Sequence, residues 1–154
     1  MAQRENSWWQ RHKFKLNGLV LILPFWFLYE SMNMTFPAAL PQQQVGPFTV
    51  TPSPLTNKAP YQHDGDWVKD FMLQFCDDCV PQIRQAYMTI AAEQPSLEQF
   101  AQAHLGILHG DNHMQHVHAL VQSPTAANQK LWLLIEDWQG EQHIASWEFS
   151  LPQS

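Results

Sequence analysis

The feature that most constrains the fold is an alternation of apolar and polar residues that recurs over most of the chain after residue 66. Side chains two apart on a strand point to the same face of a sheet, so this alternation predicts strands with one buried face. The alternating segments are 67–75, 83–91, 113–121, 131–138 and 143–149, and an edge strand is expected within 45–55, where prolines exclude a central position.

Turn and helix signals complete the prediction for this part of the chain. The last two segments are joined by Gln139-Gly140-Glu141-Gln142, where glycine can take the positive φ of a tight turn. One short helix is predicted, because Ser96 and Gln99 have capping-box spacing and the apolar helical face stops at Gly106. Six or seven short strands are typical of an immunoglobulin-like antiparallel β-sandwich, although the Cys…Trp…Cys spacing of antibody domains is absent. The predicted fold class is therefore mainly β.

The N-terminal segment differs in charge and hydropathy from the rest. Residues 1–18 carry four basic residues and one acidic residue, a net of +3, so the chain total of −6 leaves −9 for the remainder. Such an acidic body excludes nucleic acid as a partner. An uncharged apolar run extends from Leu19 to Tyr29, and the wider segment 16–34 approaches the roughly 20 residues that cross a bilayer.

This pattern predicts an uncleaved transmembrane signal anchor over 16–34. The alternatives are a cleaved secretory signal, which lacks small residues at the A-x-A positions, and a buried helix of a globular domain. The positive-inside rule then makes 1–15 a cytoplasmic basic flank, 35–44 a Pro/Gln linker and 45–154 a periplasmic β-sandwich domain. The expected location is the bacterial inner membrane, with a single pass and the C-terminal domain in the periplasm.

Histidines are concentrated in the second half of the domain predicted over 45–154. Met114, His116 and His118 would share one face of the strand predicted over 113–121. Imidazole with thioether suits copper, whereas imidazole with carboxylate suits zinc, nickel or iron. The turn around Gly110 could fold over this row and add ligands. The predicted metal site therefore consists of His109, Asp111, His113, Met114, His116 and His118, and copper, iron and zinc are the candidate ions.

Two other interpretations of the histidines stay open. Histidine titrates near pH 6.5, so a row of histidines can act as a pH sensor. Alternatively, the side chains are simply polar residues on a solvated face. Leu120 continues the row, so the same face could also border the core.

The chain has two cysteines, in the sequence Cys76-Asp77-Asp78-Cys79. Such a pair can form a structural disulfide, act as a redox couple or supply metal thiolates. The two carboxylates between the cysteines disfavour a thiolate, so a structural disulfide is the preferred interpretation. No G-x-S-x-G, H-E-x-x-H or Gly-rich phosphate loop occurs. Neither an enzymatic activity nor a catalytic residue is predicted.

Several segments resemble those of a family of small bacterial proteins. These are Pro24-Phe25-Trp26-Phe27, Val45-Gly46-Pro47-Phe48 and the closing hairpin with Leu131-Trp132-Leu133, Trp138, Gly140 and Ala145-Ser146-Trp147. They are similar to small uncharacterised single-pass proteins of Gram-negative bacteria that accompany PepSY-type membrane reductases and TonB-dependent metal uptake. The resemblance implies an accessory role in periplasmic metal handling, and it transfers no catalytic residue.

The sequence thus predicts a membrane-anchored periplasmic accessory protein for handling iron or copper, or for assembling a metal-dependent membrane complex. Its expected partners are the inner membrane and an integral membrane protein. One alternative is a non-catalytic structural interaction subunit of an inner-membrane complex. The other is a periplasmic thiol-disulfide protein that uses Cys76 and Cys79.

Overall fold

The computed structural model describes residues 8–33, 35–102, 106–112, 114–125 and 128–151. The chain divides into two compact units, Met1–Thr35 and Phe36–Ser154. Within the described residues, the first unit contains two helices and the second contains a nine-stranded sheet and one short helix. The prediction of a mainly β protein is confirmed.

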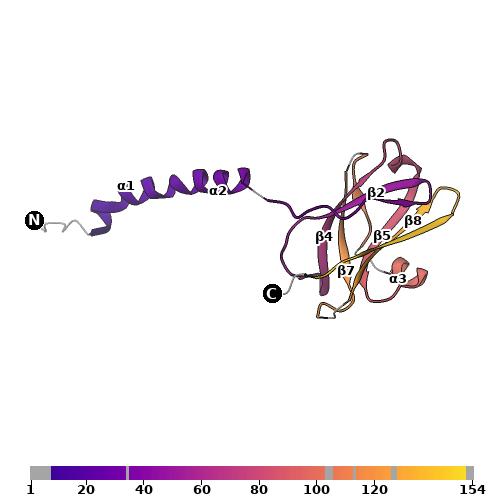
Figure 1. The fold of residues 1–154 in the computed structure, drawn as a ribbon. Coiled ribbons are helices and arrows are strands. Elements are labelled where there is room, and N and C mark those ends of the chain that lie inside the picture. Colours follow the sequence, from indigo (N-terminus) through magenta and orange to yellow (C-terminus); the bar gives the residue numbers. More distant parts are fainter. Residues whose placement is uncertain (1–7, 34, 103–105, 113, 126–127, 152–154) are drawn as a thin grey trace, which may run out of the picture. The chain divides into compact units, whose positions relative to one another are not determined.

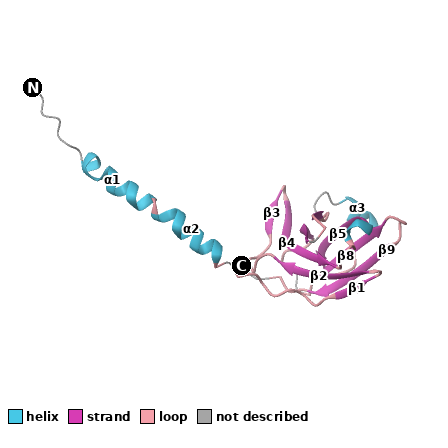
Figure 2. Ribbon diagram, turned by 90° about the horizontal axis from the view of Figure 1, so that it is seen from above, coloured by secondary structure: helices cyan, strands magenta, loops and turns pink. Residues whose placement is uncertain are grey.

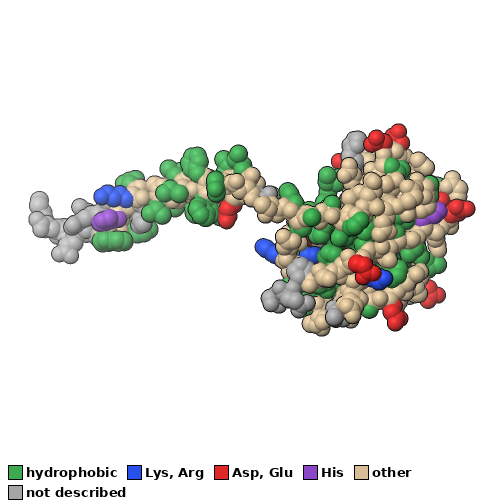
Figure 3. Space-filling model, viewed as in Figure 1, with side chains coloured by type: hydrophobic (Ala, Val, Ile, Leu, Met, Phe, Trp, Pro, Cys, Tyr) green, Lys and Arg blue, Asp and Glu red, His purple; other side chains and the backbone are tan. Residues whose placement is uncertain are grey.

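The N-terminal unit consists of the consecutive helices α1 (Trp8–Val20) and α2 (Ile22–Met32). They separate at Leu21, which follows from the position of Pro24: this residue has no N–H to donate to the carbonyl of Val20, and its ring crowds that oxygen. Apolar side chains lie along both helices (Figure 3). The apolar run of the sequence is therefore shared between two short helices.

This division overturns the membrane prediction. None of the helices in the described part of the chain combines the length and the apolar character needed to cross a membrane. The transmembrane anchor predicted over 16–34 is wrong, and so is the predicted single-pass location in the inner membrane with a periplasmic C-terminal domain.

The second unit is built on one continuous sheet, whose strands run side by side in Figure 1. Its main path has the order β1-β2-β4-β7-β5-β8-β9, while β3 pairs with β4 and β6 pairs with β7. The strands are β1 (Gln43–Val45), β2 (Phe48–Pro54), β3 (Tyr61–His63), β4 (Asp66–Phe75), β5 (Ile83–Ala91), β6 (His109–Gly110), β7 (Met114–Val121), β8 (Lys130–Asp137) and β9 (Gln142–Glu148).

The apolar residues of the alternating segments lie on the inner face of this sheet, and the polar residues between them lie on the outer face. Phe71 and Leu73 of β4 are fully buried, as are Val117 and Ala119 of β7. Their neighbours in the sequence point outward, and these include the two histidines of β7. Hence the inner face is the hydrophobic core, and the outer face is where polar side chains can form a site.

The sheet does not form the predicted immunoglobulin-like antiparallel sandwich. Strands β5 and β7 pair in parallel through Thr89 with Leu120 and Ile90 with Val121, which joins what would otherwise be two sheets. The sheet also curls until its two end strands meet (Figure 2). There the side-chain amide of Gln43 in β1 donates to the carbonyl of Ser146 in β9, at 3.0 Å.

Strand β2 explains how prolines are tolerated so close to the core. Pro52 and Pro54 pair with β4 on one side of β2. On its other side β1 covers only Phe48 to Val50, so neither proline needs an N–H for a second ladder. The segment predicted as an edge strand is thus a short hairpin. Along the proline-bearing half of β2, β1 does not pair with it, and the carbonyl of Pro52 instead accepts the backbone N–H of Leu40 at 2.8 Å.

The one predicted helix of the second unit is confirmed as α3 (Leu97–Gln102). The backbone N–H of Ser96 donates to Oε1 of Gln99 at 2.8 Å, and the N–H of Gln99 donates to Oγ of Ser96 at 3.3 Å. These two bonds are the reciprocal pair of a capping box. The local signal in the sequence was therefore sufficient to locate the start of this helix.

Candidate metal centre

The outer face of the sheet brings together residues from three strands. In the register of β4 and β7, Asp70 lies opposite His118 and Met72 lies opposite His116. On the other side of β7, the short strand β6 places His109 opposite His116. Side chains that face each other across neighbouring strands lie within contact distance, so strand pairing alone gathers three imidazoles and a carboxylate.

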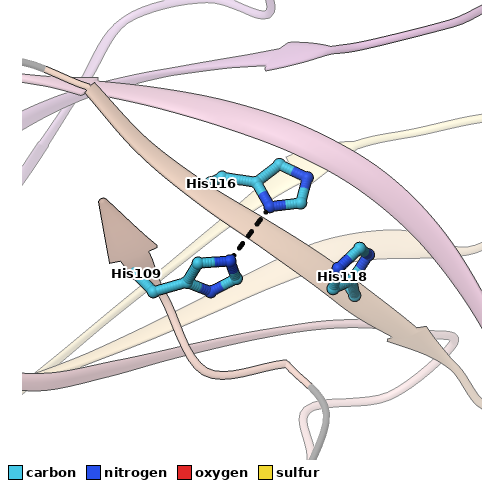
Figure 4. A group of neighbouring side chains, drawn as sticks. All are labelled: His109, His116 and His118. Atoms are coloured by element: carbon cyan, nitrogen blue, oxygen red, sulfur yellow. Dashed lines mark hydrogen bonds between the residues drawn. The ribbon is translucent and has the colours of Figure 1, made fainter. Parts of the chain in front are cut away.

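The three imidazoles converge on one another, as Figure 4 shows. One ring nitrogen from each of His109, His116 and His118 lies within 4.8 Å of the other two. Nδ1 of His116 and Nε2 of His109 are 3.2 Å apart. Two nitrogen ligands of a tetrahedral zinc ion, each about 2.05 Å from the metal, would be separated by about 3.3 Å. Two of the three ligand atoms are therefore already at coordination spacing.

The hydrogen bonds indicate which ring nitrogens carry protons when no metal is bound. Nδ1 of His109 lies 3.3 Å from the carbonyl of Ile107 and can only donate to it. In the neutral ring this leaves Nε2 of His109 as the acceptor, so His116 donates its Nδ1 proton to it. For both lone pairs to face an ion, the neutral ring of His116 would change tautomer, with its proton on Nε2, the nitrogen that lies 3.9 Å from Oδ1 of Asp70.

Asp70 orients the histidines of β7. Nδ1 of His118 donates to Oδ1 of Asp70 at 2.6 Å, which leaves Nε2 of His118 free for a metal. The same oxygen lies 3.9 Å from Nε2 of His116. Metal-binding histidines commonly donate their second ring N–H to a carboxylate, which fixes the tautomer and raises the basicity of the ligand. Asp70 is positioned for this role.

Tyr61 of β3 holds Asp70 in place. Its hydroxyl donates to both carboxylate oxygens, at 3.0 and 3.1 Å. Burial, the hydrogen bond to Asp70 and the negative charge of Asp70 all raise the pKa of Tyr61, so the phenol stays protonated and remains a donor. The ring of His63, also on β3, stacks on His118 with centroids 5.0 Å apart. Strand β3 therefore packs along one side of the histidine group.

The electrostatics favour the neutral, metal-binding form of His116. Burial lowers the pKa of His116, and the charges of His118 and His109 lower it further, whereas Asp70 acts in the opposite direction. A neutral imidazole is the form that binds a metal. His116 is thus prepared for coordination around neutral pH.

The structure separates the residues predicted for the metal site into groups. His109, His116 and His118 come together, whereas His113 lies outside the described residues. Asp111 shapes the turn between β6 and β7, because its Oδ1 accepts the backbone N–H of Met114 at 2.9 Å. Met114 lies on the same face of β7 as His116 and His118 but lines a neighbouring apolar pocket.

Asp70, Tyr61 and His63 were not among the residues predicted for the site. The alternation over 67–75 does place Asp70 on the outward face of its strand. The alternation does not indicate, however, that this strand pairs with the strand that carries His116 and His118. Asp70 and His118 are 48 residues apart in the sequence. Pairing between distant strands was the missing information.

A second cluster of metal-ligand residue types lies at the turn between β8 and β9 and has a structural explanation. Oδ1 of Asp137 accepts the backbone N–H groups of Gln139 and Glu141, and Oδ2 lies 3.3 Å from Nε2 of His143. Burial would raise the pKa of Asp137, but these hydrogen bonds and the charge of His143 together lower it. The carboxylate closes the hairpin turn.

The two cysteines are joined by a disulfide. Cys79 is buried in the core, while Sγ of Cys76 accepts the backbone N–H of Thr49 at 3.2 Å. The bond ties the end of β4 to the 3₁₀ turn Val80–Gln82. In this form the sulfurs are not thiolate ligands, and they do not belong to the histidine group.

Comparison with known proteins identifies the family of the chain. Neither the curated proteins nor the solved structures include a significant match to it. A family model described as "Uncharacterised conserved protein UCP029505" matches residues 8–150, and this description names no activity, ligand or partner. Because the match covers nearly the whole chain, the protein belongs to this family of uncharacterised conserved proteins.

Proposed function

We propose that the protein binds a transition-metal ion through His109, His116 and His118 and serves as an accessory protein in transition-metal handling. The observation that carries this proposal is the convergence of three imidazole nitrogens within 4.8 Å of one another. The bond between Asp70 and His118 adds support, because it is the outer-shell contact that metal-binding histidines usually have.

The exposure of the site supports handling of an ion over permanent structural binding. Structural zinc sites are closed by four protein ligands, whereas sites that exchange a ligand keep a position open. Here three imidazoles converge, and the side chains of His116 and His118 are 25% and 28% exposed. His109 lies on the exposed strand β6. An ion at this site would be open to water or to a ligand from another molecule.

The donor set restricts the ion. Imidazole nitrogens suit zinc, copper, iron and nickel, whereas magnesium and calcium prefer oxygen ligands. The three-histidine group therefore favours Zn(II), Cu(II) or Fe(II). Its affinity should follow the general order in which Cu(II) binds more tightly than Fe(II) or Zn(II).

Calorimetric titration of the purified full-length protein with Zn(II), Cu(II) and Fe(II) tests this proposal. We expect one ion per chain, and we expect His116→Ala to weaken binding by at least about 100-fold, since it removes a ligand. The matched control is His12→Ala, in helix α1 of the first unit and not a member of this group of histidines, which should bind as the unchanged protein does. Wild-type binding no tighter than about 10 µM, or equal binding by His116→Ala, would overturn the proposal.

A further inference from the structure

We propose that Met72 and Met114 form a Cu(I) site beside the histidine group, with the imidazole of His116 as the third ligand. This inference rests on the proposed function, because His116 belongs to both sites. It differs from that function in the oxidation state of the ion, Cu(I), and in the donor atoms, which are thioether sulfurs. The two methionines also lie outside the three-histidine group. It would make copper, in its reduced state, one of the ions that the protein carries.

The register of the sheet places both thioethers next to His116. Met72 of β4 lies directly opposite His116, and Met114 precedes His116 by two residues on the same face of β7. His109 approaches His116 from the opposite side, on β6. In the register of the sheet, His116 therefore stands between His109 on β6 and Met72 on β4. Methionine has enough rotatable bonds to bring its sulfur to such a neighbour.

A pocket of about 280 Å³ lies at the two methionines. Both line it together with Phe36, Pro54 and Leu55, and the two other lining residues, Ser53 and Gln74, are uncharged. No described residue in this lining carries a charge. A doubly charged ion is poorly stabilised in such surroundings, because burying charge without compensating carboxylates is costly. The free-energy cost of removing the ion from water is smaller for a soft, singly charged ion with thioether ligands.

The chemistry of the donors selects copper among the candidate ions. Thioether sulfur is a soft ligand that favours Cu(I), whereas zinc and iron prefer thiolate, imidazole or carboxylate donors. Packing alone explains the methionines less well, because Met114 is 50% exposed. A half-exposed thioether at an apolar pocket is accessible to an incoming ion.

The test measures Cu(I) affinity of the full-length protein without oxygen, by competition with a coloured Cu(I) chelator. The variant is Met72→Leu/Met114→Leu, because leucine replaces methionine with little change in volume and no sulfur. Met32→Leu, an exposed methionine of α2, is the matched control. Zn(II) affinity of each protein, measured in parallel, reports whether the histidine group is intact.

We expect the double variant to lose at least about tenfold in Cu(I) affinity while its Zn(II) affinity and both affinities of Met32→Leu stay unchanged. Equal Cu(I) affinity of the double variant and the wild type would overturn the methionine site and leave the three-histidine proposal standing. Loss of both ions in the double variant would also overturn it, because that result indicates general disturbance. A wild-type protein that binds neither ion would overturn both proposals.

Discussion

At the scale of single residues, the site depends on a carboxylate that does not itself need to touch a metal. Asp70 accepts hydrogen bonds from His118 and Tyr61 and lies near His116. Its outward position is visible in the sequence pattern, but its partners are not.

Asp70→Asn should weaken Zn(II) binding by about 10- to 100-fold. The amide has nearly the same shape but lacks the negative charge that attracts the Nδ1 proton of His118 and fixes its tautomer. Titration calorimetry measures the effect, and Asp66→Asn, exposed at the start of the same strand, is the matched control. Identical affinities of Asp70→Asn and the wild type would show that Asp70 has no role in binding.

Asp137 should contribute to the pH dependence of stability. Its pKa is lowered in the folded protein, so its contribution to the free energy of unfolding is present above its usual pKa and is lost as the pH falls through the folded value. Asp137→Asn should therefore lose less stability than the wild type between about pH 5 and pH 2. Urea unfolding at several pH values measures the free energy of unfolding of both proteins. If it fell equally with pH in Asp137→Asn and in the wild type, Asp137 would not be responsible for this pH dependence.

At the scale of secondary-structure elements, local patterns were enough to predict the strands but not their pairing. The segment 83–91 was predicted with the bounds that β5 has, and the capping box located α3. The parallel contact of β5 with β7 leaves no local pattern, because Thr89 and Leu120 are 31 positions apart in the sequence. Strand β6, by contrast, pairs with the nearby start of β7, close to the turn expected around Gly110. Asp70 reaches His118 only through the long-range pairing of β4 with β7, whereas His109 reaches His116 through the local pairing of β6 with β7.

The short strand β6 provides an element-scale prediction through Gly110. Its φ of +154° is one that other residues rarely adopt, and an added Cβ would overlap the carbonyl oxygen of Met114. Gly110→Ala should push β6 away from β7 and remove His109 from the site. We expect Zn(II) binding to weaken as much as in His109→Ala, with the thermal transition of the sheet little changed.

The control for this prediction is Gly140→Ala, at another glycine with positive φ, where an added Cβ meets nothing within 4 Å. Its φ is +83°, and it lies in the turn between β8 and β9. Gly140→Ala should leave Zn(II) binding unchanged. If Gly110→Ala bound Zn(II) as the wild type does, β6 would not be needed to position His109.

At the scale of the whole molecule, the chain consists of two units with different character. The first was interpreted as a membrane anchor because its apolar run was taken as one continuous helix. A single proline, Pro24, divides that run between two helices. The second unit contains the core, the disulfide and every residue of the candidate metal centre.

A truncated chain of residues 36–154 should therefore fold and bind Zn(II) with the affinity of the full-length protein. No side chain of the site comes from the first unit. Scanning calorimetry and zinc titration of the fragment test this prediction. A fragment that is unfolded, or that folds without binding zinc while the full chain binds it, would show that the first unit is required.

Anomalous diffraction from zinc-loaded crystals would show directly whether the three histidines on one face of the sheet hold a metal. We predict one anomalous peak about 2.0–2.1 Å from a ring nitrogen of each of His109, His116 and His118. Asp70 should remain hydrogen-bonded to His118. A zinc peak elsewhere on the chain, with the three imidazoles uncoordinated, would contradict the claim.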